Sequence, residues 1–392
     1  MPPLVILLWI TVACLSLTRG FLTSLKPGQS QDLQMILNWL TTWFWQASSP
    51  YRLPVGAVAN YPPHFISFLS PLALLPFRSA VVVWSVLNVA MAPFAGFVAF
   101  RIFKPDARRK AALLPCAMFL SWAGLRVGLG NGQFTLLALT FGLLATLTAD
   151  RRPLVSGVLL ALALTKPHVG AAFLLWAVFT KRYKIVGASV AVAFAGLVIF
   201  CLRLGENLVA VIGDFFRVLN SQLAGKTFLA GIFELRPLVH VVIPYFTAAE
   251  AVHFTVILVL LCIIGVAALR MDSGAPNQRD TIVLQLFCLW DLIAVYHSPY
   301  DSVIMLPVVV GLYLAALGDP STYSRGSILL WIVQLALVIE VPFLGWKLSE
   351  YGHPLSVGYL RAVLAHFDRM LLIVVCCYVL YLNRHHWASA RP

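Results

Sequence analysis

The residues best suited to chemistry in this sequence are a few charged side chains set among long apolar segments. Asp32 is the only acidic residue between positions 19 and 78, whereas Arg126 and Lys166 each lie at the end of a short apolar segment. A carboxylate can remove a proton from an attacking hydroxyl group. Fixed cations can hold a phosphate and stabilise the charge that develops on a leaving group. These residue types are therefore candidates for a general base and for anion-binding groups.

Each of these residues also has a structural explanation that the sequence leaves open. Asp32 falls in the first turn of a predicted helix, where an acidic side chain stabilises the helix N-terminus. Arg126 and Lys166 have long side chains that can reach from a membrane-spanning segment to the aqueous surface. This second explanation is weaker for Lys166, because Pro167 and His168 follow it directly.

A proline-rich segment after the predicted helix supplies further candidates for substrate binding. Tyr61 and His64 flank Pro62 and Pro63, two residues that restrict the backbone and remove hydrogen-bond donors. Such a rigid turn would hold both side chains at the membrane surface. A plain bend of the chain before it re-enters the membrane is the alternative explanation.

Polar residues also cluster late in the chain. His297, Tyr300 and Asp301 fall at a predicted helix junction. His297 is a candidate for hydrogen bonding to a substrate, and a purely structural histidine explains this position equally well. Asp291 and Glu340 lie inside apolar segments, and we interpret them as buried partners of cations.

The composition places all these residues in an integral membrane protein. Hydrophobic residues make up 60% of the 392 positions and charged residues only 11%. Soluble globular proteins carry about 25% charged residues, which cover a surface that must face water. A bilayer removes this requirement because the surface that contacts lipid is apolar.

The net charge of +13 and the pI near 9.7 would also fit a nucleic-acid-binding protein. We exclude nucleic acid as a partner because the basic residues form short clusters between apolar segments, such as Arg108-Arg109-Lys110 and Arg151-Arg152. This pattern is typical of cytoplasmic loops. The seven cysteines all lie in apolar segments without metal-ligand spacing, so we predict neither a metal site nor a disulfide framework.

The apolar segments predict about twelve membrane-spanning helices in a single membrane domain over residues 1–392, with both termini cytoplasmic. Short joints such as 149–153 and 180–184 are basic, which places the long segments 19–78 and 204–247 on the outer face. We interpret the first span as a retained helix, because no basic n-region or clear cleavage site accompanies it. The predicted spans are residues 3–18, 79–101, 111–125, 133–149, 153–165, 168–180, 184–203, 248–269, 281–296, 302–317, 327–345 and 367–383.

The segment 29–46 in the first outer loop is predicted to form an amphipathic helix. Its apolar residues recur at the spacing of one helix face and are Leu33, Ile36, Leu37, Leu40, Trp43 and Phe44. It also contains three tryptophans, which are typical of the membrane–water interface. We therefore expect this helix to lie flat on the outer surface, with Asp32 in its first turn.

The order of several short motifs resembles glycosyltransferase family 87. An acid in an interfacial helix is followed by Ser49-Pro50-Tyr51, by Tyr61-Pro62-Pro63 and by the P-L-x-x-L-P pattern of residues 71–76. Further on, Gly130-Asn131-Gly132-Gln133 is similar to the G-Q-x-N/T segment of the family, and Lys166-Pro167 is similar to its K-P element. Residues 297–301 fall where the family carries polar residues in a late outer loop.

This resemblance implies an all-α membrane fold of the C type (GT-C) and an inverting transfer of a hexose, usually mannose. The implied donor is a polyprenyl-phosphate sugar and the implied acceptor is a lipid or a glycan. Asp32 is implied as the base, with no metal and no cofactor, at a site on the extracytoplasmic face of the inner (plasma) membrane. The residues then expected to bind substrate are Tyr61, His64, Arg126, Asn131, Gln133, Lys166, His168, His297, Tyr300 and Asp301.

Two other classes of function stay open at this point. A transporter or lipid flippase also combines many spans with embedded charges, although the sequence shows no convincing paired repeat. A non-catalytic membrane subunit explains the hydrophobicity but not the polar residues gathered on one side. The enzyme hypothesis requires Asp32 to share a cavity with Arg126 and Lys166.

Overall fold

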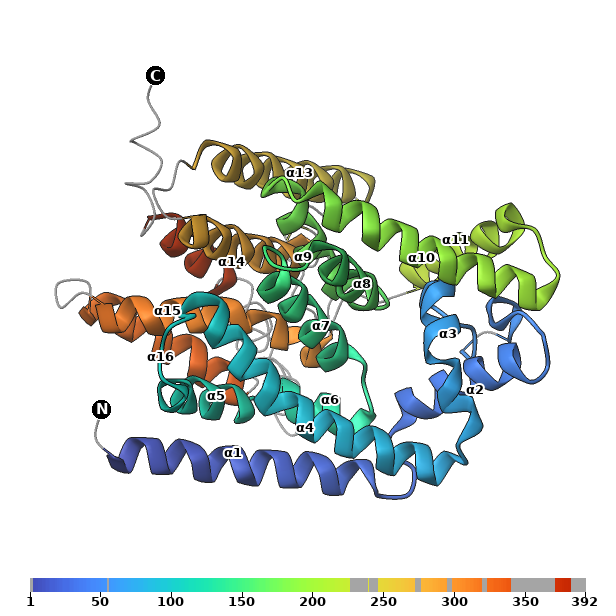
Figure 1. Cartoon of the computed structure of the whole chain (residues 1–392), viewed down its shortest axis with the longest axis horizontal. Helices are drawn as coiled ribbons and strands as arrows, with labels where there is room; N and C mark the ends of the chain where they lie inside the picture. The colour runs from blue at the N-terminus through green and yellow to red at the C-terminus, as the bar shows by residue number, and fades with distance from the viewer. Residues whose placement is uncertain are drawn as a thin grey trace.

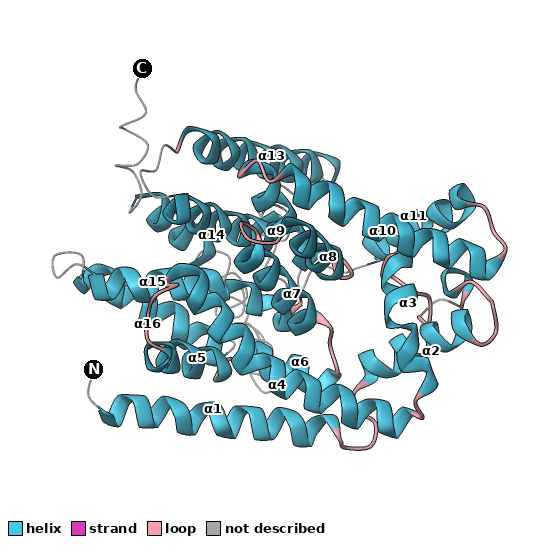
Figure 2. Ribbon diagram, viewed as in Figure 1, coloured by secondary structure: helices cyan, strands magenta, loops and turns pink. Residues whose placement is uncertain are grey.

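The fold is known from a computed structural model that describes residues 3–54, 56–225, 239, 246–271, 276–294, 298–318, 323–339 and 371–381. All regular structure in these ranges is helical, as Figure 2 shows. The predicted all-α class is therefore confirmed. A helix satisfies its backbone hydrogen bonds internally, which is what a chain in hydrocarbon requires.

The helices follow one another closely along the chain. The α-helices are α1 (Pro3–Ser24), α2 (Gln31–Phe44), α3 (Pro63–Leu69), α4 (Phe77–Phe103), α5 (Leu113–Leu120), α6 (Ala123–Asn131), α7 (Thr135–Thr148), α8 (Pro153–Ala163), α9 (Pro167–Phe179), α10 (Tyr183–Leu204), α11 (Leu208–Gly225), α13 (Phe246–Arg270), α14 (Pro276–Ala294), α15 (Leu306–Gly318) and α16 (Tyr323–Ile339). A further apolar helix covers Leu371–Tyr381. Short 3-10 helices are η1 (Pro50–Arg52), η2 (Ser70–Leu74), η3 (Arg109–Ala112) and η4 (Pro299–Met305).

Several helices are long and apolar enough to cross a membrane. Among the described residues there are five such helices, namely Leu4–Ser24, Phe77–Phe103, Tyr183–Leu204, Ala248–Arg270 and Tyr300–Leu317. Other apolar helices, including α7, α8 and α9, have 10–17 residues and are shorter than the roughly 20 that a full span needs. The chain is thus a multi-span membrane protein, and the count of twelve spans stays a prediction.

The predicted span 111–125 is not one straight helix, because two helices cover it. α5 and α6 meet at Ser121 and Trp122 and are bent by 68° relative to each other. The side chain of Gln334 on α16 satisfies groups at this break: its Nε2 donates to the Met118 carbonyl at 2.8 Å, and its Oε1 accepts from Trp122 Nε1 at 3.0 Å. A break inside a membrane protein is stable when neighbouring side chains take up the freed backbone groups in this way.

The long helices lie side by side, and the helices of the two segments predicted as outer loops gather at one end of them. Figure 1 shows α1 along one edge and α13 along the opposite edge, with α2, α3 and α11 together at the right-hand end. Within the bundle α4 packs on α7, α8 packs on both α7 and α10, and α9 packs on α14. Residues 226–238 and 240–245 of the predicted second outer loop lie outside the described residues.

The amphipathic helix predicted in the first outer loop is confirmed as α2, but its tryptophans do not all face the membrane interface. Trp39 and Trp43 are buried in the protein, and only Trp45 is exposed. The indole N–H of Trp39 donates to the Ala57 carbonyl at 2.5 Å, and that of Trp43 donates to the Phe200 carbonyl at 3.2 Å. Because the protein itself supplies partners for both N–H groups, these rings can leave the interface.

One glycine allows α2 to approach the turn between α6 and α7. Gly132 has a φ of 70°, in the left-handed region that favours glycine. A Cβ atom at this position would lie only 2.7 Å from Cβ of Leu33, so a side chain would push α2 away. The Gly132 carbonyl also accepts a hydrogen bond of 3.0 Å from Trp84 Nε1 on α4. This turn therefore brings the residue that follows, Gln133, beside α2.

We expect Gly132→Ala to destabilise the protein by about 3 kcal/mol, through backbone strain and overpacking. The measurement is the thermal unfolding midpoint of the purified protein in one detergent. Gly187→Ala is the matched control, because a Cβ atom there meets no heavy atom within 4 Å. Equal midpoints for the two variants would contradict the close approach of this turn to α2.

Candidate active site

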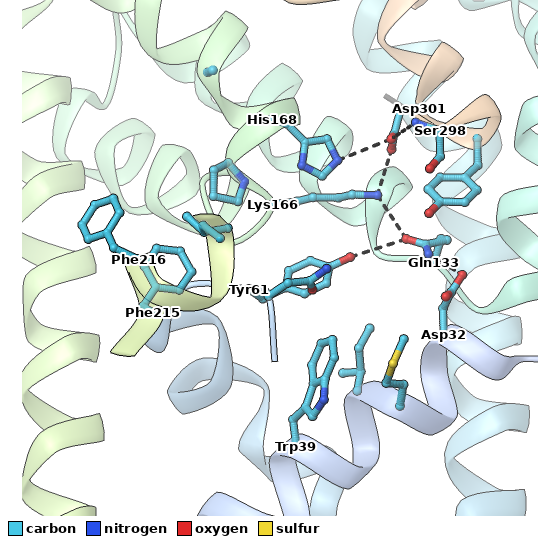
Figure 3. A pocket seen from close by; sticks show the side chains of 17 residues that line it. Asp32, Trp39, Tyr61, Gln133, Lys166, His168, Phe215, Phe216, Ser298 and Asp301 are labelled. Atoms are coloured by element: carbon cyan, nitrogen blue, oxygen red, sulfur yellow. Dashed lines mark hydrogen bonds and ion pairs between the residues drawn. The ribbon is translucent and has the colours of Figure 1, made fainter. Parts of the chain in front are cut away.

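A cavity of about 590 Å³ opens where α2 and α11 meet the ends of the bundle (Figure 3). Its walls come from α2, the turn before α7, the start of α9, α11 and η4. Its polar lining residues are Asp32, Asn60, Tyr61, Gln133, Lys166, His168, Ser298, Tyr300 and Asp301. Segments that are far apart in the sequence thus converge on one space.

The backbone that holds Lys166 is set by the next residue. Pro167 begins α9 and disfavours a helical backbone at Lys166, whose φ and ψ are −117° and 88°. Helix α8 therefore ends at Ala163, and α9 begins with its N-terminus at the cavity. The side chain of Lys166 is only 2% exposed, so its ammonium group needs partners inside the protein.

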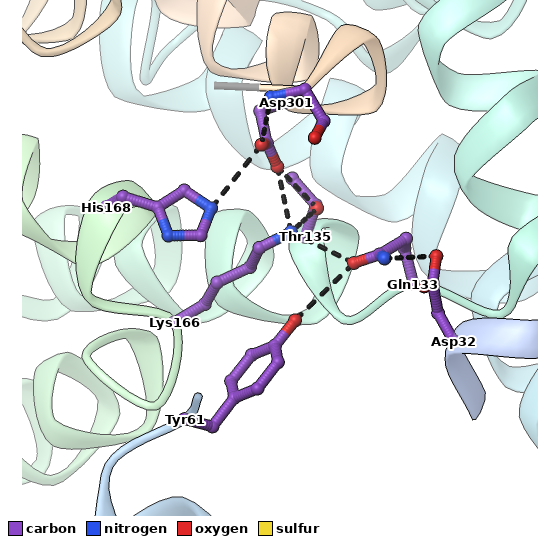
Figure 4. A network of polar contacts seen from close by, with 8 residues as sticks. Asp32, Tyr61, Gln133, Thr135, Lys166, His168 and Asp301 are labelled. Atoms are coloured by element: carbon purple, nitrogen blue, oxygen red, sulfur yellow. Dashed lines mark hydrogen bonds and ion pairs between the residues drawn. The ribbon is translucent and has the colours of Figure 1, made fainter. Parts of the chain in front are cut away.

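The ammonium group of Lys166 has three acceptors, as Figure 4 shows. Its Nζ lies 2.8 Å from Asp301 Oδ1 and 3.1 Å from Gln133 Oε1, and it also donates to the hydroxyl of Thr135. The ring of Tyr300 adds a cation–π contact at 4.7 Å from its centre. An ammonium group has three donors, so this buried cation is fully satisfied.

Asp301 is the counter-charge of this cation. Its Oδ1 accepts from Thr135 Oγ1 at 2.8 Å, and its Oδ2 accepts from the backbone N–H of Ser298 at 2.9 Å. Oδ2 also lies 3.4 Å from His168 Nε2. The Asp301 side chain is 1% exposed, whereas that of His168 is 30% exposed. Of these groups, His168 therefore presents the more accessible nitrogen to the cavity.

Gln133 connects this cluster to Asp32. The Gln133 Nε2 donates to Asp32 Oδ2, while its Oε1 accepts from Lys166. Burial raises the pKa of the Asp32 carboxyl above its usual value; the Gln133 hydrogen bond and the charge of Lys166 lower it, and the charge of Asp301 raises it. A carboxylate with a raised pKa is a stronger base than an exposed one.

Most predicted site residues lie at this cavity. Asp32, Gln133, Lys166, His168, Tyr300 and Asp301 all line it, and so does Tyr61. The hydroxyl of Tyr61 lies 3.5 Å from Gln133 Oε1, and its ring stacks on Phe65. His297 lies outside the described residues. Asp291 is buried on α14, away from the lining of the cavity.

Arg126, Asn131 and His64 are not among the residues that line the cavity. Arg126 and Asn131 lie in α6, and the structure does not place Arg126 among the residues that line the cavity of Asp32. His64 packs against Gly196 of α10, and burial lowers its pKa to about 4. It is therefore neutral at pH 7. Of the two cations that the enzyme hypothesis required beside Asp32, Lys166 lines the cavity and Arg126 does not.

Sequence reasoning missed Thr135 and the aromatic wall. Thr135 is a polar residue at the start of the apolar helix α7, two positions after Gln133, and the other threonines of this helix gave it no distinguishing signal. Phe215 and Phe216 line the cavity from α11. Their signal was an amphipathic pattern within the segment predicted as the second outer loop.

A charged network fastens α11 to the first outer loop. Arg52 on η1 forms two hydrogen bonds of 2.7 and 2.9 Å with the Glu206 carboxylate, and its Nε lies 2.7 Å from Asp214 Oδ2. Asp214 lies in α11 and is also paired with Arg217 at 2.7 Å. The neighbouring Phe215 packs against Tyr51 with 5.7 Å between ring centres. Arg52 thus holds the helix that forms the aromatic wall.

The fold and cavity define a helical integral membrane protein with a buried polar site at one end of its helices. The sequence model of glycosyltransferase family 87 matches residues 60–299, which is more than half of the chain. The protein therefore belongs to glycosyltransferase family 87 and is a membrane glycosyltransferase. No curated protein matches the sequence.

Family membership decides in favour of the enzyme hypothesis over the transporter and the non-catalytic subunit. The matched range contains Gln133, Lys166 and His168, whereas Asp32 precedes it and Asp301 follows it. The two carboxylates of the site thus lie outside the range that the family model matches. The residues inside and outside the matched range meet in the one network described above.

We expect Arg52→Glu to raise KM for sugar transfer several-fold, because a third carboxylate would repel Glu206 and Asp214 and release α11. Combining Arg52→Glu with Glu206→Arg restores one pair of opposite charges. The double variant should therefore have a KM between those of Arg52→Glu and the unmodified protein. The measurement is the initial rate of sugar transfer by purified variants. Arg78→Glu, a charge reversal at an exposed arginine, is the control. An unchanged KM in Arg52→Glu would rule out this positioning role.

Proposed function

We propose that the protein transfers a hexose, with mannose as the first candidate, from a polyprenyl-phosphate donor to a lipid or glycan acceptor. The transfer takes place with inversion on the extracytoplasmic face and uses Asp32 as the general base. One observation carries this proposal: a carboxylate with a raised pKa shares a cavity with a buried lysine and an accessible histidine.

The proposed step needs few groups. Asp32 accepts the proton of the acceptor hydroxyl while that oxygen forms a bond to the anomeric carbon. The bond between the anomeric carbon and the phosphate oxygen breaks, and its electrons leave with the polyprenyl phosphate. The leaving phosphate needs positive or hydrogen-bonding partners rather than a proton. Metal independence and the absence of a cofactor belong to this proposal.

The basic side of the cavity supports phosphate binding by more than one group. Asp301 compensates the charge of Lys166, so this lysine alone offers a phosphate little net attraction. His168 is exposed to the cavity, and it lies in the first turn of α9, whose N-terminus carries a partial positive charge. We therefore assign the donor phosphate to the space beside His168 and the start of α9.

The apolar side of the cavity suits a lipid-linked substrate. Met35, Ile36 and Trp39 of α2 face Phe215 and Phe216 of α11 across it. The exposed Phe216 ring gives a prenyl chain an apolar surface, and aromatic rings can also pack against the faces of a sugar. This combination of a polar floor and an apolar wall fits a donor with a charged phosphate and a hydrocarbon chain.

We expect Asp32→Asn to lower sugar transfer by about 10²–10⁴-fold, the usual contribution of a general base. The asparagine keeps the size of the side chain and a hydrogen-bonding group for Gln133, so the protein should stay folded. The assay incubates purified protein with radiolabelled polyprenyl-phosphate sugars and a membrane lipid extract, then separates labelled products.

Asp106→Asn is the matched control, because Asp106 is an exposed acid away from the cavity. It should retain full activity and the same unfolding midpoint as the unmodified protein. Normal transfer by Asp32→Asn would refute the assigned base. Activity with only one member of the donor panel would identify the sugar.

As the pH is lowered, sugar transfer should be lost at a higher pH than it would be with a base whose pKa is that of an ordinary aspartate. The base works only when deprotonated, and its pKa is raised by burial, so activity falls as pH drops through a value above the usual 3.9 or so. The measurement is kcat/KM against pH, with samples returned to neutral pH to check that the protein has not unfolded. If the apparent pKa of the acidic side of this pH profile lay at or below the usual aspartate value, the raised pKa would be contradicted.

A further inference from the structure

A second cavity of about 490 Å³ lies at the opposite end of the helices that form the active site. The active site uses the start of α7 and of α9, whereas this cavity uses the last residues of α4 and α7 and the turn between α9 and α10. Four of its lining residues are arginines, and two are aspartates: Arg101, Arg151, Arg152, Arg182, Asp150 and Asp280.

Arg182 forms the fixed floor of this second cavity. Its guanidinium lies 2.7 Å from Asp150 and 2.5 Å from Asp280, and it stacks over the ring of Trp176 at 5.2 Å. The Trp176 Nε1 also donates to the Asp280 carbonyl at 3.1 Å. Two carboxylates thus compensate this partly buried arginine and link the turns at Asp150 and Arg182 to α14.

The remaining arginines give this cavity an excess of positive charge. Arg101 makes one hydrogen bond of 3.2 Å to the Ala107 carbonyl. Arg151 and Arg152 have exposed side chains, which form no hydrogen bond or ion pair within the described ranges. Because the four arginines outnumber the two aspartates, guanidinium donors remain available to an anion.

We propose that this cavity binds the headgroup of an anionic phospholipid. A guanidinium group matches a phosphate in charge and geometry, and basic pockets at the ends of membrane helices suit anionic headgroups. Leu147 lines the cavity and is 41% exposed, and Leu154 on the adjacent α8 is 69% exposed. These apolar side chains offer acyl chains a surface directly beside the arginines, which a free phosphate would not use.

The proposal is tested with the full-length protein in a neutral detergent. The unfolding midpoint is measured while the protein is titrated with phosphatidylglycerol, with phosphatidylcholine or with sodium phosphate. We expect phosphatidylglycerol alone to stabilise the protein. The variant with Arg151→Gln and Arg152→Gln should bind it about 30-fold more weakly, from about 1 kcal/mol for each basic residue.

The matched control carries Arg108→Gln and Arg109→Gln, which remove the same charge from exposed arginines that do not line the cavity. It should bind phosphatidylglycerol like the unmodified protein. Equal weakening in both variants would overturn the proposal in favour of general surface electrostatics. Equal stabilisation by sodium phosphate would assign the site to a free anion, and no preference over phosphatidylcholine would also overturn the proposal.

Discussion

The burial of one lysine is the constraint on which the active site depends. A buried ammonium group is stable only when each of its donors has an acceptor and its charge has a counter-charge. For Lys166 these partners come from Gln133 and Thr135 around the start of α7 and from Asp301 on η4. The start of α7, the start of α9 and η4 must therefore meet at one point. The same requirement places Gln133 where its amide can also reach Asp32.

Interruptions of the helices make this meeting possible. A continuous span places its polar backbone groups at the two membrane surfaces, whereas α7, α8 and α9 are shorter than a full span. Gly132 turns the chain before α7, and Pro167 turns it before α9. Each interruption leaves backbone groups and a helix terminus that polar side chains satisfy. The polar residues of the site thus lie at the points where helices end.

The sequence predicted the helices well and the contacts between them poorly. Apolar length located α7 to α10, and apolar periodicity located α2, because both depend on the chain locally. The same reasoning did not predict the bend within 111–125, where Gln334, far along the chain, forms hydrogen bonds at the break between α5 and α6. It also grouped Arg126 with Lys166, since position near a helix end does not fix which side of the helix a side chain faces. The choice of Asp301 as the partner of Lys166 required the fold.

The pairing of Lys166 with Asp301 sets a condition on donor binding. The site then holds the compensated lysine and the carboxylate of Asp32, so a phosphate adds negative charge that this lysine does not balance. An imidazolium at His168 would balance it while forming an ion pair with Asp301 Oδ2, 3.4 Å away. Asp301 would then serve two cations, one buried for structure and one accessible to substrate. In the proposed mechanism, Lys166 then acts chiefly by fixing the carboxylate that orients His168, and His168 and the N-terminus of α9 would attract the phosphate.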